Sequence, residues 1–111
     1  MVLETLFGNR TTERILLHLF HYGEIYARGI ARDYDSVVSP FIRQLDRLED
    51  SSILVSREVG RTRLYQFNPK SPCVTPLKKI VEIVYESIPL NEREKIFQTR
   101  RRPRRKGKPV L

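Results

Sequence analysis

The sequence has little of what metal sites, disulfides and membrane spans require. Among 111 residues there is one cysteine, Cys73, and two histidines, His18 and His21. One cysteine cannot close an intrachain disulfide, and these three side chains cannot form a four-ligand zinc site without carboxylates. No apolar run approaches the ~18 residues of a membrane span, and Met1 to Thr5 shows no secretory signal. No glycine-rich phosphate loop is present. We therefore expect a cytoplasmic protein that is not an enzyme and has no metal, cofactor or membrane partner.

Charge is distributed unevenly along the chain. There are 21 lysines and arginines against 13 acidic residues, a formal net charge of +8. Seven of the basic residues lie between Thr99 and Leu111, where there is no acid, so the first 98 residues hold 14 basic and 13 acidic side chains. This pattern predicts a near-neutral folded body, too short for two full cores, followed by a basic flexible tail over 99–111.

Two stretches near the start have helical periodicity. The first is capped by Asn9 or Thr11 and ended by Gly23, with His18 expected at the surface or edge. A short extended piece then leads to a second helix over 27–33, which ends in a tight polar turn.

A third helix begins between Ser36 and Ser39 and ends at Ser51-Ser52. Ser39 followed by Pro40 is a favourable start, because proline lacks the amide that would be unpaired at the first helical position. Four apolar residues at helical spacing predict a single buried face: Val38, Phe41, Leu45 and Leu48.

The spacing of apolar residues then changes from that of a helix to that of a strand. Residues 53–59 and 62–67 are rich in β-branched and aromatic side chains and are separated by a turn at Gly60. This pattern predicts a β-hairpin in which Leu54 or Val55 faces Tyr65 and Phe67.

Helical patterns return after the hairpin. Thr75-Pro76 starts a fourth helix that Pro89 ends, with a predicted inward stripe of Leu77, Ile80, Val81, Val84 and Ile88. Asn91 with Glu94 predicts a capped short helix over 92–98. We expect a domain over 1–90, this short helix over 91–98 and the tail.

This order of elements predicts a mostly α protein with a small β-hairpin (α+β), a winged helix-turn-helix with three core helices, a wing and a C-terminal helix. The sequence resembles the ArsR/MarR-like winged-helix transcriptional regulators, particularly small prokaryotic members found beside or fused to minimal nucleotidyltransferases. The resemblance covers roughly 3–88 and is carried by 6–11, Ile15-Leu16, 30–32, 45–49 and 60–69. It implies a DNA-binding regulator associated with the nucleoid of a prokaryotic cell. The sequence lacks the cysteine pairs of ArsR-type metal sensors, so the resemblance does not imply that this protein senses metals.

The outward face of the third helix carries side chains that can read bases. It is predicted to show Ser39, Pro40, Arg43, Gln44 and Arg47. Arginine bonds guanine O6 and N7 in bidentate fashion and glutamine does the same for adenine, each contact giving ~1–3 kcal/mol of discrimination. The alternative is a solvated face on which the arginines pair with neighbouring acids.

The hairpin tip and the tail add further basic side chains. Arg57, Arg61, Thr62 and Arg63 surround Gly60, and Arg28 opens the second helix. They predict contacts to phosphates or the minor groove, although charged hairpin ends also discourage aggregation. The tail supplies Arg100, Arg101, Arg102, Arg104, Arg105 and Lys106, which can bind DNA or RNA phosphates or simply aid solubility.

Ile83 and Tyr85 lie off the main stripe of the fourth helix and predict a homodimer, unless they complete a monomer's core. A two-fold dimer would place two reading helices about 34 Å apart on double-stranded DNA. Two other functions remain open: an RNA- or ribonucleoprotein-associated basic protein, and a winged-helix module that docks a partner protein.

Overall fold

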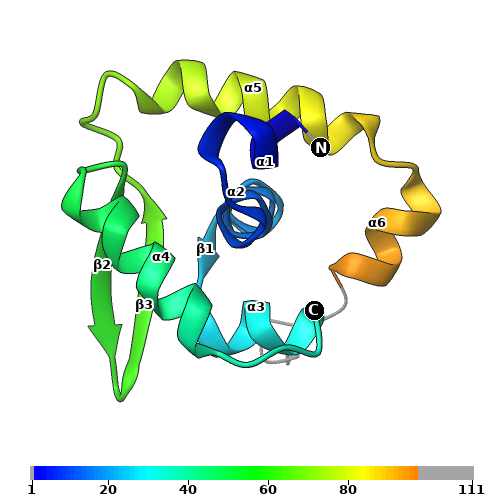
Figure 1. The fold of residues 1–111 in the computed structure, drawn as a ribbon. Helices are drawn as coiled ribbons and strands as arrows, with labels where there is room; N and C mark the ends of the chain where they lie inside the picture. The colour runs from blue at the N-terminus through cyan, green and yellow to red at the C-terminus, as the bar shows by residue number, and fades with distance from the viewer. Residues whose placement is uncertain (1, 98–111) are drawn as a thin grey trace, which may run out of the picture.

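A computed structural model of the protein describes residues 2–97. In these residues the elements follow in the order α1 (Val2–Phe7), α2 (Arg10–Tyr22), β1 (Glu24–Ile25), α3 (Ala27–Asp33), α4 (Ser39–Asp50), β2 (Leu54–Val59), β3 (Thr62–Phe67), α5 (Val74–Ser87) and α6 (Leu90–Ile96). The long strands β2 and β3 lie at one side of the molecule, on the left in Figure 1. The predicted α+β winged helix is confirmed. Across 2–97 no helix has the length and apolarity to cross a membrane.

Helix α2 lies at the centre of the fold, and Figure 1 views it almost end-on. Asn9 caps it, because its Oδ1 accepts a hydrogen bond from the Thr12 amide at 2.9 Å. Gly23 ends it at a φ of 84°, a left-handed conformation that favours glycine, and donates its amide to the Leu19 carbonyl at 2.8 Å. Both predicted ends are confirmed. The helix contacts α4 on one side and α5 on another, so it forms the common core of the molecule.

Three strands pair in the order β1-β3-β2, all antiparallel. Leu54 pairs with Phe67 and Ser56 with Tyr65, so these side chains share the face turned toward the helices. Of the two predicted possibilities, Leu54 is therefore the residue that faces the core. Ile25 of β1 also pairs with Tyr65, which ties the segment before α3 to the base of the wing.

Helices α3 and α4 form the predicted helix-turn-helix. Helix α3 keeps its predicted bounds and buries Ile30 and Ala31. The predicted inward stripe of α4 is confirmed, because Phe41 and Leu45 are buried while Val38 and Leu48 pack at the edge of the core.

Helix α1 is not predicted by the sequence pattern. It buries only Leu3 in the core, so no periodic apolar stripe marks it. Its first turn is held by Glu13 of α2, whose carboxylate Oε2 accepts a hydrogen bond from the Glu4 amide at 3.1 Å. This contact explains how the short helix docks against α2.

Several helix ends differ from the prediction. Ser39 and Pro40 are the first two helical residues of α4, and the cap position is Val38, which makes no side-chain capping bond. Helix α6 begins at Leu90 after Pro89 without a side-chain cap, so the predicted Asn91–Glu94 capping is wrong.

The end of α4 carries a non-glycine residue in a left-handed conformation. Ser52 has a φ of 67°, and the Ser52 amide bonds the Glu49 carbonyl at 2.9 Å. This is the conformation that a glycine adopts most easily at a helix end. Ser52 therefore has a strained backbone conformation at the point where the chain leaves α4 for the wing.

Candidate nucleic-acid interface

The exposed face of α4 presents Arg43. Ser39 and Arg43 are exposed, and Pro40 is half-buried beside them. Within residues 2–97 Arg43 makes no hydrogen bond or ion pair, so the alternative in which it pairs with acids of the same helix is not seen. Its guanidinium donors are therefore not used by any other residue of this part of the chain.

Gln44 is not on the outward face, and the prediction that placed it there is wrong. The residue is only 8% exposed, because the helix turns it into the contact between α2 and α4. Its Oε1 accepts a hydrogen bond from Arg47 Nη1 at 2.6 Å and a longer one from Thr12 Oγ1 at 3.5 Å. Arg47 is exposed as predicted, but one end of its guanidinium is tied to this buried amide.

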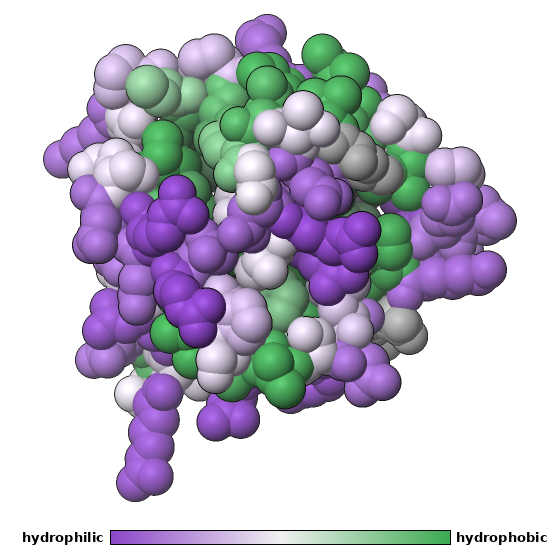
Figure 2. All heavy atoms as spheres, viewed as in Figure 1, coloured by the Kyte–Doolittle hydropathy of each residue, from purple (hydrophilic) through white to green (hydrophobic). Residues whose placement is uncertain are grey.

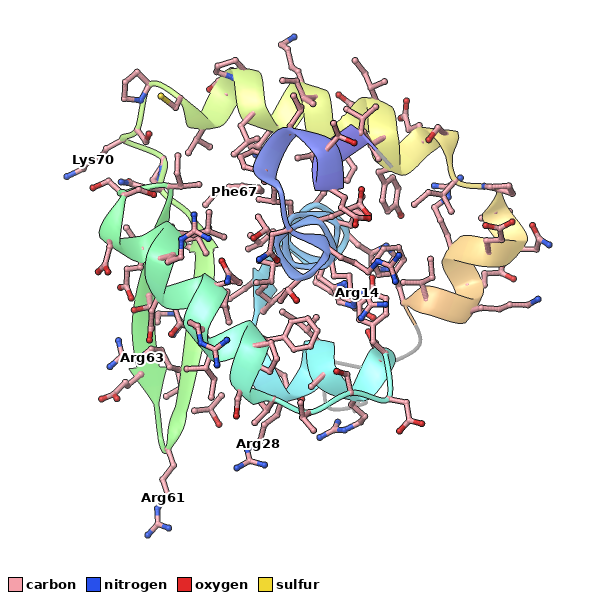
Figure 3. All side chains as sticks on the ribbon, in the orientation of Figure 1. Arg14, Arg28, Arg61, Arg63, Phe67 and Lys70 are labelled. Atoms are coloured by element: carbon pink, nitrogen blue, oxygen red, sulfur yellow. The ribbon has the colours of Figure 1, made fainter. Side chains whose placement is uncertain are left out.

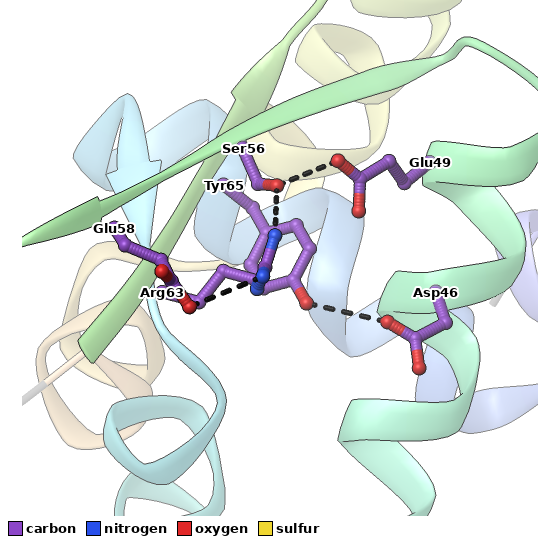
Figure 4. A network of polar contacts seen from close by, with 6 residues as sticks. All are labelled: Asp46, Glu49, Ser56, Glu58, Arg63 and Tyr65. Atoms are coloured by element: carbon purple, nitrogen blue, oxygen red, sulfur yellow. Dashed lines mark hydrogen bonds and ion pairs between the residues drawn. The ribbon is translucent and has the colours of Figure 1, made fainter. Parts of the chain in front are cut away.

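The wing side of α4 carries acids that bond to the wing (Figure 4). Glu49 Oε2 accepts a hydrogen bond from the Ser56 hydroxyl at 2.6 Å, and Asp46 Oδ1 accepts one from the Tyr65 hydroxyl at 3.4 Å. Burial, and next the negative charge of Asp46, raise the pKa of Tyr65 to about 12. The two contacts fix the angle between the helix and the hairpin.

Arg63 joins the same network. Its Nη1 donates to Ser56 Oγ at 2.9 Å and its Nη2 to Glu58 at 3.2 Å. Arg63 therefore lies on the face of the hairpin that looks toward α4, with roughly half of its side chain exposed.

Arg57 lies on the opposite face of the sheet, which corrects its predicted place beside the wing tip. Alternation along β2 turns it away from Ser56, and it forms a bidentate pair with Glu24 of β1 at 2.9 and 3.0 Å. The hydrogen bond and charge of Glu24 raise the pKa of Arg57 above its usual value. Its charge is thus balanced on a surface that does not face α4.

Arg28 and Arg61 point away from the body at the same edge of the molecule (Figure 3). Arg28 stands at the start of α3, and Arg61 stands with exposed Thr62 at the wing tip, where Gly60 turns the chain at a φ of 62°. No hydrogen bond or ion pair ties either arginine to another residue of the described chain.

A groove of about 550 Å³ runs between α4 and the wing. Its lining includes apolar Val38 and Ile42, the acids Asp46 and Glu49 of α4, and three arginines, namely Arg28, Arg61 and Arg63. The groove therefore combines three basic side chains with two carboxylates that the wing already engages.

The predicted tail residues, Arg100, Arg101, Arg102, Arg104, Arg105 and Lys106, lie outside the described residues.

The two residues predicted for dimerisation have different surroundings. Ile83 is 70% exposed. Tyr85 instead packs within its own chain, because its hydroxyl bonds His21 Nδ1 at 2.8 Å and its ring lies 4.9 Å from that of Phe20. The prediction for Tyr85 is therefore corrected: it belongs to the contact between α5 and α2.

Helices α1 and α5 contact each other, and both expose apolar side chains, which we call the apolar strip: Val2 and Leu6 on α1, and Ile80 and Ile83 on α5. Ile80 was expected inside and is 40% exposed, because the helix is rotated so that Val81 and Val84 fill the core. Apolar side chains gather in the upper part of the surface in Figure 2, whereas the wing is mostly polar.

The sequence analysis did not predict the buried polar pair formed by His18 and Asp33. His18 is fully buried, its Nε2 lies 2.8 Å from Asp33 Oδ2, and its Nδ1 lies 3.0 Å from the Arg14 carbonyl. A carbonyl only accepts, so Nδ1 carries the proton of that bond. Phe97 packs edge-on against the imidazole at 4.8 Å and closes the site. His18 thus joins the C-terminal ends of α2, α3 and α6, and its predicted surface position is wrong.

The described residues contain no group of three or more histidine, cysteine or acidic side chains that could hold a metal ion. Cys73 is exposed before α5. The candidate site is therefore an arginine-bearing surface formed by α3, α4 and the wing.

Comparisons with known proteins agree with this architecture. No protein-family model matches the sequence, and no curated protein matches it. Among solved structures, the chain is similar to the AntR antimony-specific transcriptional repressor, with a TM-score of 0.56 and 26% sequence identity over 78% of this chain and 76% of that one. The match supports the ArsR-like winged-helix resemblance, and the similar protein is a transcriptional repressor rather than an enzyme.

Proposed function

We propose that this ArsR-like winged-helix protein is a transcriptional regulator that binds double-stranded DNA, with α4 in the major groove and the wing on the adjacent backbone or minor groove. The observation that carries the proposal is Arg43, which has no hydrogen-bond or ion-pair partner among residues 2–97 and stands on the exposed face of a helix anchored by Phe41 and Leu45. An α-helix fits the major groove, and arginine is the side chain that most often reads guanine there.

Phosphate contacts would come from arginines at the edge of this surface. Arg28 and Arg61 project from α3 and the wing tip in one direction, as they must if both meet the same duplex. A strand that separates the major from the minor groove would run along the groove between α4 and the wing. Arg63 lines that groove together with Asp46 and Glu49. We also assign phosphate binding to the basic residues between 100 and 106, where each neutralised phosphate steepens the log-log salt dependence by about 0.9.

The test is selection of bound sequences from a random duplex pool at two salt concentrations. We expect a consensus sequence that survives the higher salt, because base contacts add to the salt-sensitive phosphate term. Deletion of residues 99–111 should keep the consensus and make the salt dependence shallower. Binding without a consensus, lost entirely on that deletion, would instead favour a basic nucleic-acid-associated protein.

We further propose that the regulator is a homodimer joined through the apolar strip of α1 and α5. The strip exposes Val2, Leu6 and Ile83, each more than half exposed. Exposed apolar patches of this kind mark association surfaces, and a two-fold pair would read a site with two matching halves.

Replacing Ile83 by glutamate should shift the protein toward monomer, because the change adds a charge to the exposed apolar side chains of α1 and α5. Sedimentation equilibrium measures the shift, and we expect the dissociation constant to rise at least about tenfold, or ~1.4 kcal/mol. Val37→Glu is the matched control, since Val37 is also 70% exposed but lies in the turn between α3 and α4. Equal behaviour of the two variants would place the dimer contact elsewhere.

The antimony response of the similar repressor is not part of this proposal. Soft ions are held by several thiolates, and the sequence contains one cysteine.

A further inference from the structure

Gln44 is a buried amide directly beneath the surface that we assign to DNA. Its side chain is enclosed between α2 and α4, yet its Oε1 meets an exposed arginine, Arg47, at 2.6 Å. The same oxygen lies 3.5 Å from the hydroxyl of buried Thr12. The contact thus links the centre of the fold to one basic side chain on the outside of α4.

We propose that Gln44 is a positioning residue that sets the base preference of Arg47, an inference that rests on the proposed DNA-binding function. A guanidinium has five N–H donors in one plane, and bidentate recognition of guanine uses two of them. One Nη1–H is committed to Gln44, which fixes the plane of the group and leaves the edge formed by Nε and Nη2 for a base. The charged donor makes this a stronger hydrogen bond than one between neutral groups.

The physical benefit is preorganisation. A long exposed side chain loses rotamer freedom when it binds, and holding it in place beforehand removes part of that loss, equivalent to roughly 2- to 12-fold in affinity per side chain. Arg43, on the same helix, has no such contact within residues 2–97 and must be ordered on binding. The two arginines are therefore expected to respond differently when Gln44 is changed.

The experiment is a double-mutant cycle in which the measured quantity is the preference for one base pair over the others. Gln44→Leu removes the acceptor but keeps a side chain of similar volume, and duplexes that vary one base pair at a time report the preference of each arginine. We expect Gln44→Leu to reduce the Arg47-dependent preference about 2- to 12-fold. In an Arg47→Ala background the same change should have no effect on preference, and in an Arg43→Ala background its effect should persist unchanged.

Thermal unfolding distinguishes a positioning role of Gln44 from a role in folding, because the base preference of Arg47 should be lost with little change in Tm. Gln44→Met, which keeps an unbranched chain, replaces the leucine variant if that variant unfolds. An unchanged preference in a folded variant would overturn the inference while leaving the proposed function intact. A wild-type protein that selects no consensus would overturn both.

Discussion

Replacing Arg43 by alanine should weaken binding to the selected duplex by about 1 to 3 kcal/mol, roughly 5- to 150-fold. The reason is that the donors of Arg43, which no other residue between 2 and 97 uses, lie on the exposed face of α4, where a base edge would lie in the major groove. Specificity should relax at one base pair of the site, whereas binding to unrelated duplexes should fall only by the effect of one lost charge. Fluorescence anisotropy with matched and singly substituted duplexes measures both quantities.

Arg57→Ala is the matched control for this experiment. It removes the same charge, but from the sheet face that looks away from α4, where Arg57 is paired with Glu24. We expect no change in base preference. If the two alanine variants weakened binding equally on every sequence, α4 would not be the element that reads bases.

Replacing Asp33 by alanine should lower the free energy of unfolding by about 3 to 5 kcal/mol, a large share of the stability of a small domain. His18 and Asp33 are both almost completely buried, and removal of the carboxylate leaves the imidazole without its partner at 2.8 Å. Urea denaturation followed by circular dichroism measures the loss. Asp33→Asn should be milder, because the amide can donate to Nε2 of a neutral imidazole.

Glu82→Ala provides the corresponding surface control, since Glu82 is exposed on α5. Its effect should stay within about 0.5 kcal/mol. A comparably small effect of Asp33→Ala would show that the His18–Asp33 pair contributes little to holding α2, α3 and α6 together.

The helix-turn-helix and the wing were predictable because their apolar residues repeat with a clear period. Phe41 and Leu45 mark the inner face of α4 by spacing alone, and Gly60 marks the turn between two β-rich runs. Helix α1 could not be found in this way, because Leu6 is 59% exposed and only Leu3 enters the core.

Buried polar residues were the main failure of sequence reasoning. Gln44 and His18 were expected at the surface, but each also has a partner far away in sequence, Thr12 for Gln44 and Asp33 for His18. Such pairings depend on tertiary packing, and no local pattern reports them. The position of Arg57 could have been predicted from the sequence, because side chains alternate between the two faces of a strand. Starting from buried Leu54, this alternation puts Ser56 on the inner face and Arg57 on the outer one.

The central position of α2 has a consequence for how a dimer would tolerate changes in its target. One helix touches both the reading helix α4 and the helix α5 that carries the proposed contact, and it is capped at both ends. In a dimer joined through α5, the path between the two α4 helices would therefore be short. Inserting one base pair between the half-sites would rotate one of them by roughly 34° about the duplex axis, given the 10–10.5 base pairs of a helical turn. A dimer held this closely could not follow that rotation without bending or untwisting the DNA, so the spacer length would become part of the recognised signal.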